Sequence, residues 1–202
     1  MRYIPNALTI ARILLTPLML VLLATPTFWG RAGALVLFVV ASASDYLDGE
    51  LARRMGAHSR FGTFLDPMAD KVLVLGTFVT LAVIEPQIVP WWAVLLIALR
   101  DVLVTGLRSW AESYGKTLRT LPAAKWKTSA QLLFLFAMLV LLALTQSGPP
   151  VRASARWLLY ETPVPLVLLL GVVGFTLYTG ALYVVQARAL YWKQTRSTEH
   201  SH

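Results

Sequence analysis

Long apolar runs separated by short polar breaks dominate the pattern of this chain. Each run is close to the roughly 20 apolar residues that a helix needs to cross a bilayer. The runs cover residues 7–24, 32–48, 66–84, 90–110, 128–145 and 164–187. Turn residues occupy the breaks between them, as at Pro26, Gly30 and Gly148-Pro149-Pro150. The pattern predicts an all-α integral membrane bundle of six transmembrane helices, organised as a single domain over residues 1–202.

The positions of the basic residues predict how this bundle is oriented. If the N-terminus is cytoplasmic, twelve Lys and Arg residues fall in cytoplasmic segments, against only Arg31, Arg152 and Arg156 on the other side. Positive charge accumulates on the cytoplasmic side of membrane proteins. We therefore expect a multi-pass protein of the cell inner (cytoplasmic) membrane with both termini in the cytoplasm. The net charge of +8 is then explained without nucleic acid as a partner.

Acidic residues are few and strongly clustered. Only ten are present, and five of them lie within residues 45–70. The four aspartates among these, Asp45, Asp48, Asp66 and Asp70, fall at the predicted cytoplasmic ends of two helices. Spacings of i,i+3 and i,i+4 place each pair on one helix face. Carboxylates at membrane depth are costly and raise one another's pKa, so they predict a compensating cation. The chain has no cysteine, and oxygen ligands alone favour Mg²⁺, Mn²⁺ or Ca²⁺.

A purely structural interpretation of these aspartates has to be considered. They could cap helices or pair with Arg53, Arg54 and Arg60. Asp66 directly precedes Pro67, which is the pattern of an N-cap followed by proline in the first helical turn. This explanation suits one aspartate better than all four together.

Small and basic residues beside the aspartates indicate the ligand. Gly49, Ala52 and Gly62 would allow a bulky group or a neighbouring backbone to approach closely, and Arg53 suits a phosphate oxygen. A divalent metal, small residues and arginine together predict a site for a phosphate ester or diphosphate.

The same stretch carries a family resemblance. Residues 45–70 match the signature D-x2-D-G-x2-A-R-x8-G-x3-D-x3-D at every fixed position, and so resemble the CDP-alcohol phosphotransferase family. Within the family, residues 5–131 are most similar to bacterial phosphatidylglycerophosphate synthases, with the block at 98–131 favouring that subfamily. The resemblance implies the six-helix fold of the family and these partners: CDP-diacylglycerol, sn-glycerol 3-phosphate, membrane lipids and a second copy in a homodimer.

The resemblance also implies roles for individual residues. It makes Mg²⁺ or Mn²⁺ the cofactor and makes the four aspartates its ligands, with Asp70 also the general base that takes the proton from the attacking glycerol hydroxyl. It implies a CDP site lined by Asp48, Gly49, Ala52, Arg53 and Gly62. The implied reaction gives phosphatidylglycerophosphate and CMP. The spacing alone does not decide which aspartate is the base.

An acceptor that carries its own phosphate requires further cations. Arg100 lies within the fourth apolar run beside Asp101, and Arg108 projects from nearly the same helix face two turns later. Arg119, Lys125 and Lys127 follow around the start of the fifth run. We expect these five residues to bind the acceptor phosphate. The alternative for Arg100 is an ion pair with an aspartate.

Other functions remain open at this point. A cardiolipin synthase of the CDP-alcohol type or a synthase using inositol phosphate would share the aspartate motif and differ in the acceptor pocket. A divalent-cation transporter would also need acidic residues, although its site is expected near the bilayer midplane. A structural membrane protein with a metal-stabilised helix pair is the remaining alternative.

Overall fold

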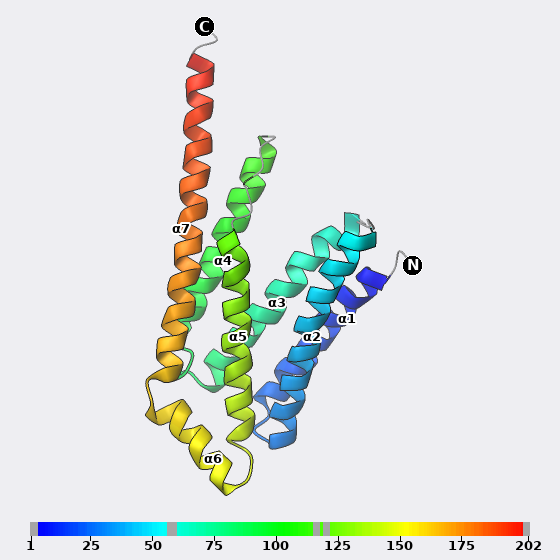
Figure 1. Cartoon of the computed structure of the whole chain (residues 1–202), viewed down its shortest axis with the longest axis vertical. Coiled ribbons are helices and arrows are strands. Elements are labelled where there is room, and N and C mark those ends of the chain that lie inside the picture. The colour runs from blue at the N-terminus through cyan, green and yellow to red at the C-terminus, as the bar shows by residue number, and fades with distance from the viewer. Residues whose placement is uncertain (1–3, 56–59, 115–117, 119–121, 200–202) are drawn as a thin grey trace.

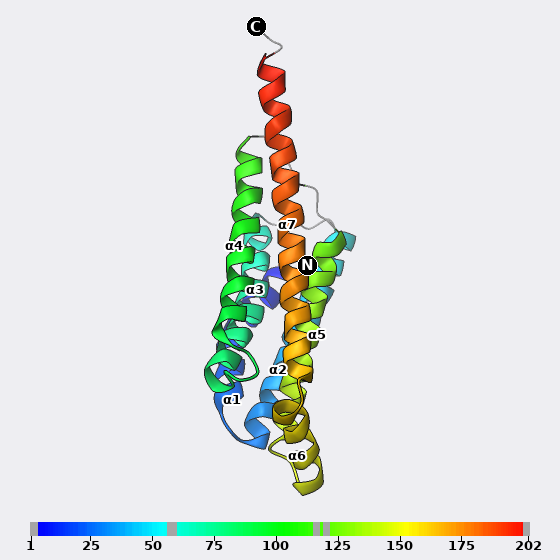
Figure 2. The same ribbon diagram turned by 90° about the vertical axis from the view of Figure 1, so that its left-hand side faces the viewer.

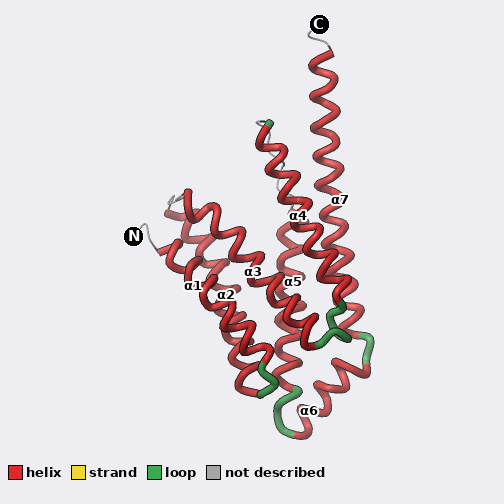
Figure 3. Tube along the Cα trace, turned by 180° about the vertical axis from the view of Figure 1, so that it is seen from behind, coloured by secondary structure: helices red, strands yellow, loops and turns green. Residues whose placement is uncertain are grey.

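Helices account for almost all of the chain in this computed structural model (Figure 1). It describes the backbone of residues 4–55, 60–114, 118 and 122–199, and the side chains of residues 12–44, 71–114, 118 and 126–189. The helices in these ranges are α1 (Ile4–Ala24), α2 (Phe28–Met55), α3 (Arg60–Ile84), α4 (Trp91–Ser113), α5 (Pro122–Leu144), α6 (Pro149–Arg156), the π-helical turn η1 (Trp157–Glu161) and α7 (Val164–Glu199). Figure 3 shows no strand in this part of the chain. The all-α prediction is confirmed.

The long helices pack in two groups that meet through α5. Helix α1 packs against α2 and α3, α4 packs against α7, and α5 contacts both α2 and α7. Figure 1 shows α6 at one end of the molecule, with the α2–α3 junction, the end of α4 and the C-terminus toward the other. Figure 2, turned by 90°, again shows α6 at one end of the molecule and the C-terminus at the other. The aspartate motif therefore lies at the end of the bundle away from α6.

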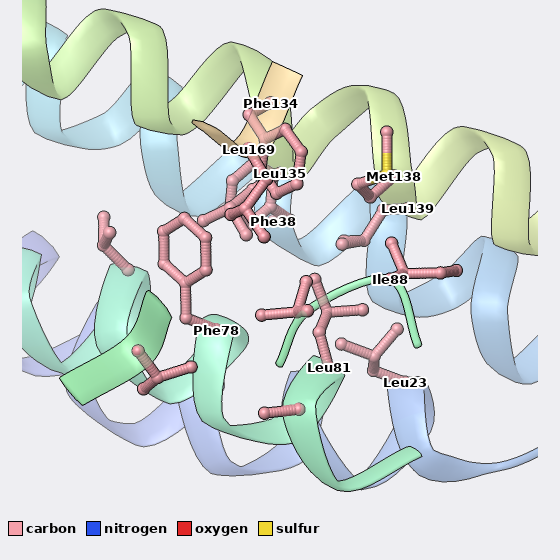
Figure 4. Close-up of a cluster of buried hydrophobic side chains, with 14 of the residues drawn as sticks. Leu23, Phe38, Phe78, Leu81, Ile88, Phe134, Leu135, Met138, Leu139 and Leu169 are labelled. Atoms are coloured by element: carbon pink, nitrogen blue, oxygen red, sulfur yellow. The ribbon is translucent and has the colours of Figure 1, made fainter. Parts of the chain in front are cut away.

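An apolar core fills the space between the helices (Figure 4). Phe78 of α3 is fully buried and stacks on Phe134 of α5, with ring centroids 5.9 Å apart and an interplanar angle of 10°. The outer surface is apolar as well, since Leu14 and Val102 are each 70% exposed. Helices that are apolar on their outer faces are typical of proteins in contact with lipid.

Two helices of the described part are long and apolar enough to cross a membrane by length and composition, Trp126–Leu144 and Val164–Ala189. Shorter apolar helical stretches occur at Arg12–Ala24, Phe28–Ser44 and Lys71–Ile84. Together with α4, these helices lie at the six expected positions, whereas six membrane crossings stay a prediction.

Two local expectations differ from the structure. Helix α3 begins at Arg60, so Asp66 and Pro67 lie inside it, and the interpretation of Asp66 as an N-cap is wrong. The break after the fifth run contains α6 and η1 rather than a simple turn. The reason is local, because Gly148 is extended and the two following prolines occupy the first helical turn, where a missing N–H costs nothing.

A polar cluster joins the helices at the α6 end. Arg31 of α2 donates to the Leu142 carbonyl at 3.2 Å and to Thr145 Oγ1 at 3.1 Å, and it pairs with Glu85 at 3.4 Å. Tyr160 donates to the other Glu85 oxygen at 2.9 Å. Burial, together with this hydrogen bond and the charge of Glu85, raises the pKa of Tyr160 to about 12, so the hydroxyl stays protonated as a donor. These contacts border a cavity of about 390 Å³.

Replacing Phe78 by alanine tests the core. The substitution removes a fully buried ring from its stack on Phe134 and should destabilise the fold by about 3 kcal/mol. The thermal midpoint of the purified protein should then fall by roughly 5–10 °C. Val83→Ala is the control on the same helix, because Val83 is 63% exposed. Equal shifts for the two variants would contradict the placement of Phe78.

Candidate functional site

The aspartate motif spans two consecutive helices that contact each other. Asp45 and Asp48 lie in the last part of α2, and Asp66 and Asp70 lie in the first part of α3. The side chains of residues 45–70 lie outside the described ones. The expected roles of the four aspartates, Gly49, Ala52, Arg53 and Gly62 are therefore untested, and their helical placement is what the structure adds.

The first described side chain after the motif links it to α4. Lys71, which directly follows Asp70, donates from Nζ to Thr105 Oγ1 at 2.6 Å. Thr105 in turn donates to the Asp101 carbonyl at 2.7 Å. This contact brings the polar face of α4 next to the start of α3, where the motif ends.

Two buried cations contact one carboxylate on this face of α4. Asp101 accepts from Arg100 at 2.9 Å and from Lys127 of α5 at 2.8 Å. The three side chains are only 9%, 11% and 7% exposed for Arg100, Asp101 and Lys127. Arg108 lies two turns further along α4. We call Arg100, Asp101, Arg108 and Lys127 the cation cluster.

Helix α7 supplies neutral partners to both arginines. Arg100 donates to Thr179 Oγ1 at 3.0 Å, and Arg108 donates to the Tyr183 hydroxyl at 2.7 Å. The buried Tyr183 ring also faces both guanidinium groups, whose central carbons lie 5.9 Å (Arg100) and 5.1 Å (Arg108) from its centroid. The prediction that the two arginines share a helix face is confirmed by this common partner.

The cation cluster carries an excess of positive charge. Arg100 and Lys127 share the Asp101 carboxylate, whereas Arg108 donates to a neutral hydroxyl, so the four side chains sum to a net charge of +2. The Nε atoms of Arg100 and Arg108 are buried and have no hydrogen-bond partner among the described residues. Buried donors without a partner are costly. The arrangement is chemically suited to an anion with several oxygen acceptors, such as a phosphate group.

The structure describes the side chains of three of the five residues that we expect to bind the acceptor phosphate. It brings together Arg100, Arg108 and Lys127, and it also confirms the alternative of an ion pair between Arg100 and an aspartate. Arg119 lies outside the described residues, and so does the side chain of Lys125. An anion site and an ion pair are compatible here, because the described contacts of Asp101 engage Arg100 and Lys127 and leave Arg108 on a neutral hydroxyl.

The partners of Arg100 and Arg108 on α7 were not predicted from the sequence. The sequence contained a signal for them. Three residues with hydroxyl groups, Thr176, Thr179 and Tyr183, occur at i, i+3 and i+7 within an apolar run and so share one helix face. Thr176 accepts from Gln131 of α5 at 3.4 Å, so the whole stripe faces the interior. Lys71 was also missed as a contact to α4.

Comparisons with known proteins identify the family of this chain. The sequence model of the CDP-alcohol phosphatidyltransferase family matches residues 2–192. The CDP-diacylglycerol–glycerol-3-phosphate 3-phosphatidyltransferase of Bacillus subtilis (strain 168) is 36% identical over 150 residues, which cover 68% of this chain and 76% of that protein. The protein of the same name from Escherichia coli (strain K12) is 37% identical over 139 residues, which cover 65% of this chain and 74% of that protein. The chain therefore belongs to the CDP-alcohol phosphatidyltransferase family.

Proposed function

We propose that this chain is a membrane phosphatidyltransferase that makes phosphatidylglycerophosphate and CMP from CDP-diacylglycerol and sn-glycerol 3-phosphate. The observation that carries the proposal is the cation cluster of α4 and α5. Thr105 links this cluster to Lys71, the residue directly after Asp70. Excess positive charge at this position suits an acceptor that brings its own phosphate. The names of the two relatives point to the same acceptor.

The donor chemistry of the motif fits a divalent ion. Two helices that pack together carry five carboxylates, the four aspartates of the motif and Glu50, and no thiolate or imidazole in residues 45–55 and 60–70. Such hard oxygen ligands are the ones that Mg²⁺ or Mn²⁺ prefers. We propose that Asp45, Asp48, Asp66 and Asp70 hold this cofactor. When bound, the ion would offset negative charge on the diphosphate and on the departing CMP.

Residues of the chain supply the remaining steps. Asp48, Gly49, Ala52, Arg53 and Gly62 line the CDP site in this proposal, with the small residues giving space and Arg53 binding phosphate oxygens. Asp70 takes the proton from a glycerol hydroxyl. That oxygen forms a bond to the β-phosphorus of CDP-diacylglycerol, and the bond from this phosphorus to the bridging oxygen breaks, so that CMP leaves.

The acceptor phosphate binds the cations of α4 and α5 in this proposal. Arg100, Arg108 and Lys127 hold it from the described part of the site, and Arg119 and Lys125 add charge from beyond it. Binding of the phosphate keeps the glycerol hydroxyl beside Asp70, so that positioning lowers part of the activation free energy of the transfer.

The family and the two long apolar helices indicate a membrane protein. We further propose that α1 to α5 and α7 cross the inner membrane six times, with both termini and the active site in the cytoplasm. The apolar outer surface and the twelve-to-three bias of basic residues support this topology. The lipid substrate can then reach the motif from the bilayer. The family resemblance supports a homodimer.

A cation transporter is less well supported by the described residues. Its path would need carboxylates that can bind an ion, whereas Asp101 is engaged by Arg100 and Lys127, and Glu85 is engaged by Arg31 and Tyr160. No observation in the described part of the chain favours transport.

An acceptor panel tests the proposed function. Purified protein with CDP-diacylglycerol and Mg²⁺ or Mn²⁺ should release CMP when sn-glycerol 3-phosphate is added, and chelation of the metal should stop the release. CMP release with phosphatidylglycerol or inositol phosphate, and none with glycerol 3-phosphate, would instead assign the chain to another acceptor.

Asp70→Asn tests the general base. The amide cannot take the proton, so turnover should fall about 100- to 10,000-fold, while the KM for CDP-diacylglycerol changes little. Glu112→Gln is the matched control, because Glu112 is an exposed acidic residue on α4. Steady-state CMP release measures both variants. An Asp70→Asn protein with near-normal turnover would contradict the assignment.

Arg100→Ala and Arg108→Ala test the acceptor site. Each removes a cation that would bind the phosphate, so the KM for glycerol 3-phosphate should rise about 10- to 100-fold, and more than the KM for CDP-diacylglycerol. Arg152→Ala is the control, since Arg152 is exposed near the α6 end. Unchanged acceptor kinetics in both variants would overturn the assignment.

A further inference from the structure

The face of α7 that meets α4 has three adjacent features: Thr179, Gly180 and Tyr183 each contact an arginine of the cation cluster. We infer that this segment of α7 is a positioning element for the acceptor phosphate, one that orients Arg100 and Arg108 without neutralising them. The inference rests on the proposed function and assigns a role to the last helix that the aspartate motif does not cover.

Gly180 lets Arg100 lie against the α7 backbone. A Cβ built at this position would be 2.9 Å from Arg100 Cγ and 3.6 Å from its Nε. Contacts under 3.0 Å require something to move, and here the nearest atom is in the middle of the arginine side chain. The absence of a side chain at Gly180 therefore sets where Arg100 can lie, and this position lets it reach both Thr179 and Asp101.

Thr179 and Tyr183 differ from Asp101 in charge. All three accept hydrogen bonds from cations, but a hydroxyl is neutral whereas the carboxylate removes one unit of positive charge. The ring of Tyr183 adds an attraction for both guanidinium groups through its π face, again without adding a negative charge. Helix α7 thus fixes the directions of the two arginines and leaves their charge available.

The net charge of the cation cluster is opposite in sign and similar in size to that of a phosphate monoester. The cation cluster keeps a net charge of +2, and a phosphate monoester carries about −1.5 to −2 near neutral pH. A phosphodiester carries a single negative charge, so it would leave part of the buried positive charge uncompensated. The positioning segment on α7 therefore favours an acceptor with a terminal phosphate over a phosphodiester lipid.

Tyr183→Phe is the first test. It keeps the ring and removes only the hydroxyl that accepts from Arg108, so the KM for glycerol 3-phosphate should rise about fivefold to tenfold. The kcat and the KM for CDP-diacylglycerol should stay within about twofold. Tyr178→Phe is the matched control on the same helix, because Tyr178 is 57% exposed. The thermal midpoint of each variant reports whether folding is retained.

Gly180→Ala is the second test. The added methyl group should displace Arg100 and raise the KM for glycerol 3-phosphate without a comparable change for CDP-diacylglycerol. Gly174→Ala is its control, since a Cβ there meets nothing within 4 Å. Both substitutions favour helix formation, so loss of helix propensity cannot explain a difference between them.

A double variant separates positioning from general stability. If Tyr183 acts through Arg108, Tyr183→Phe should have no further effect on the acceptor KM in an Arg108→Ala background. Additive effects, an equal rise in both KM values, or a lower thermal midpoint with unchanged kinetics would overturn the inference. Absence of CMP release by the unaltered protein with glycerol 3-phosphate would instead refute the proposed function itself.

Discussion

The arrangement of the site depends on the carboxylate of Asp101. Arg100 and Lys127 lie in the interior of a helical bundle, where an unpaired cation is costly, and Asp101 serves both of them. This one side chain joins α4 to α5, and Arg100 extends the connection to Thr179 on α7. Within the four described side chains of the cation cluster, this single carboxylate leaves a net charge of +2. This net positive charge makes the face of α4 suitable for an anionic substrate.

Buried arginines have different kinds of partners at the two ends of the bundle. At the α6 end, Arg31 is paired with Glu85, whose second oxygen accepts from Tyr160, and the contacts hold α2 to α5 and to the segment before α7. Within the described cation cluster, three cations accompany one carboxylate, and Tyr183 is a neutral partner of Arg108. The first arrangement holds helices together, and the second is chemically suited to binding an anion.

Much of the fold could be predicted because apolar runs and prolines directly determine where long helices form. Arg100 and Arg108 could be placed on one face because helical periodicity is regular. The start of α3 at Arg60 could not, since the Asp66-Pro67 pair imitates a helix start. Tyr183 and Gly180 were missed because their importance depends on which helix packs against α7, and this contact joins residues some 80 positions apart. The roles of the aspartates rest on the motif.

The most direct test is a structure of the Asp70→Asn protein with Mn²⁺, CDP-diacylglycerol and glycerol 3-phosphate bound. The account predicts that anomalous scattering places the metal among Asp45, Asp48 and Asp66, and that the acceptor phosphate lies within hydrogen-bonding distance of Arg100 and Arg108. A phosphate bound elsewhere, with both arginines still held by Asp101 and α7 and remote from the ligand, would contradict it.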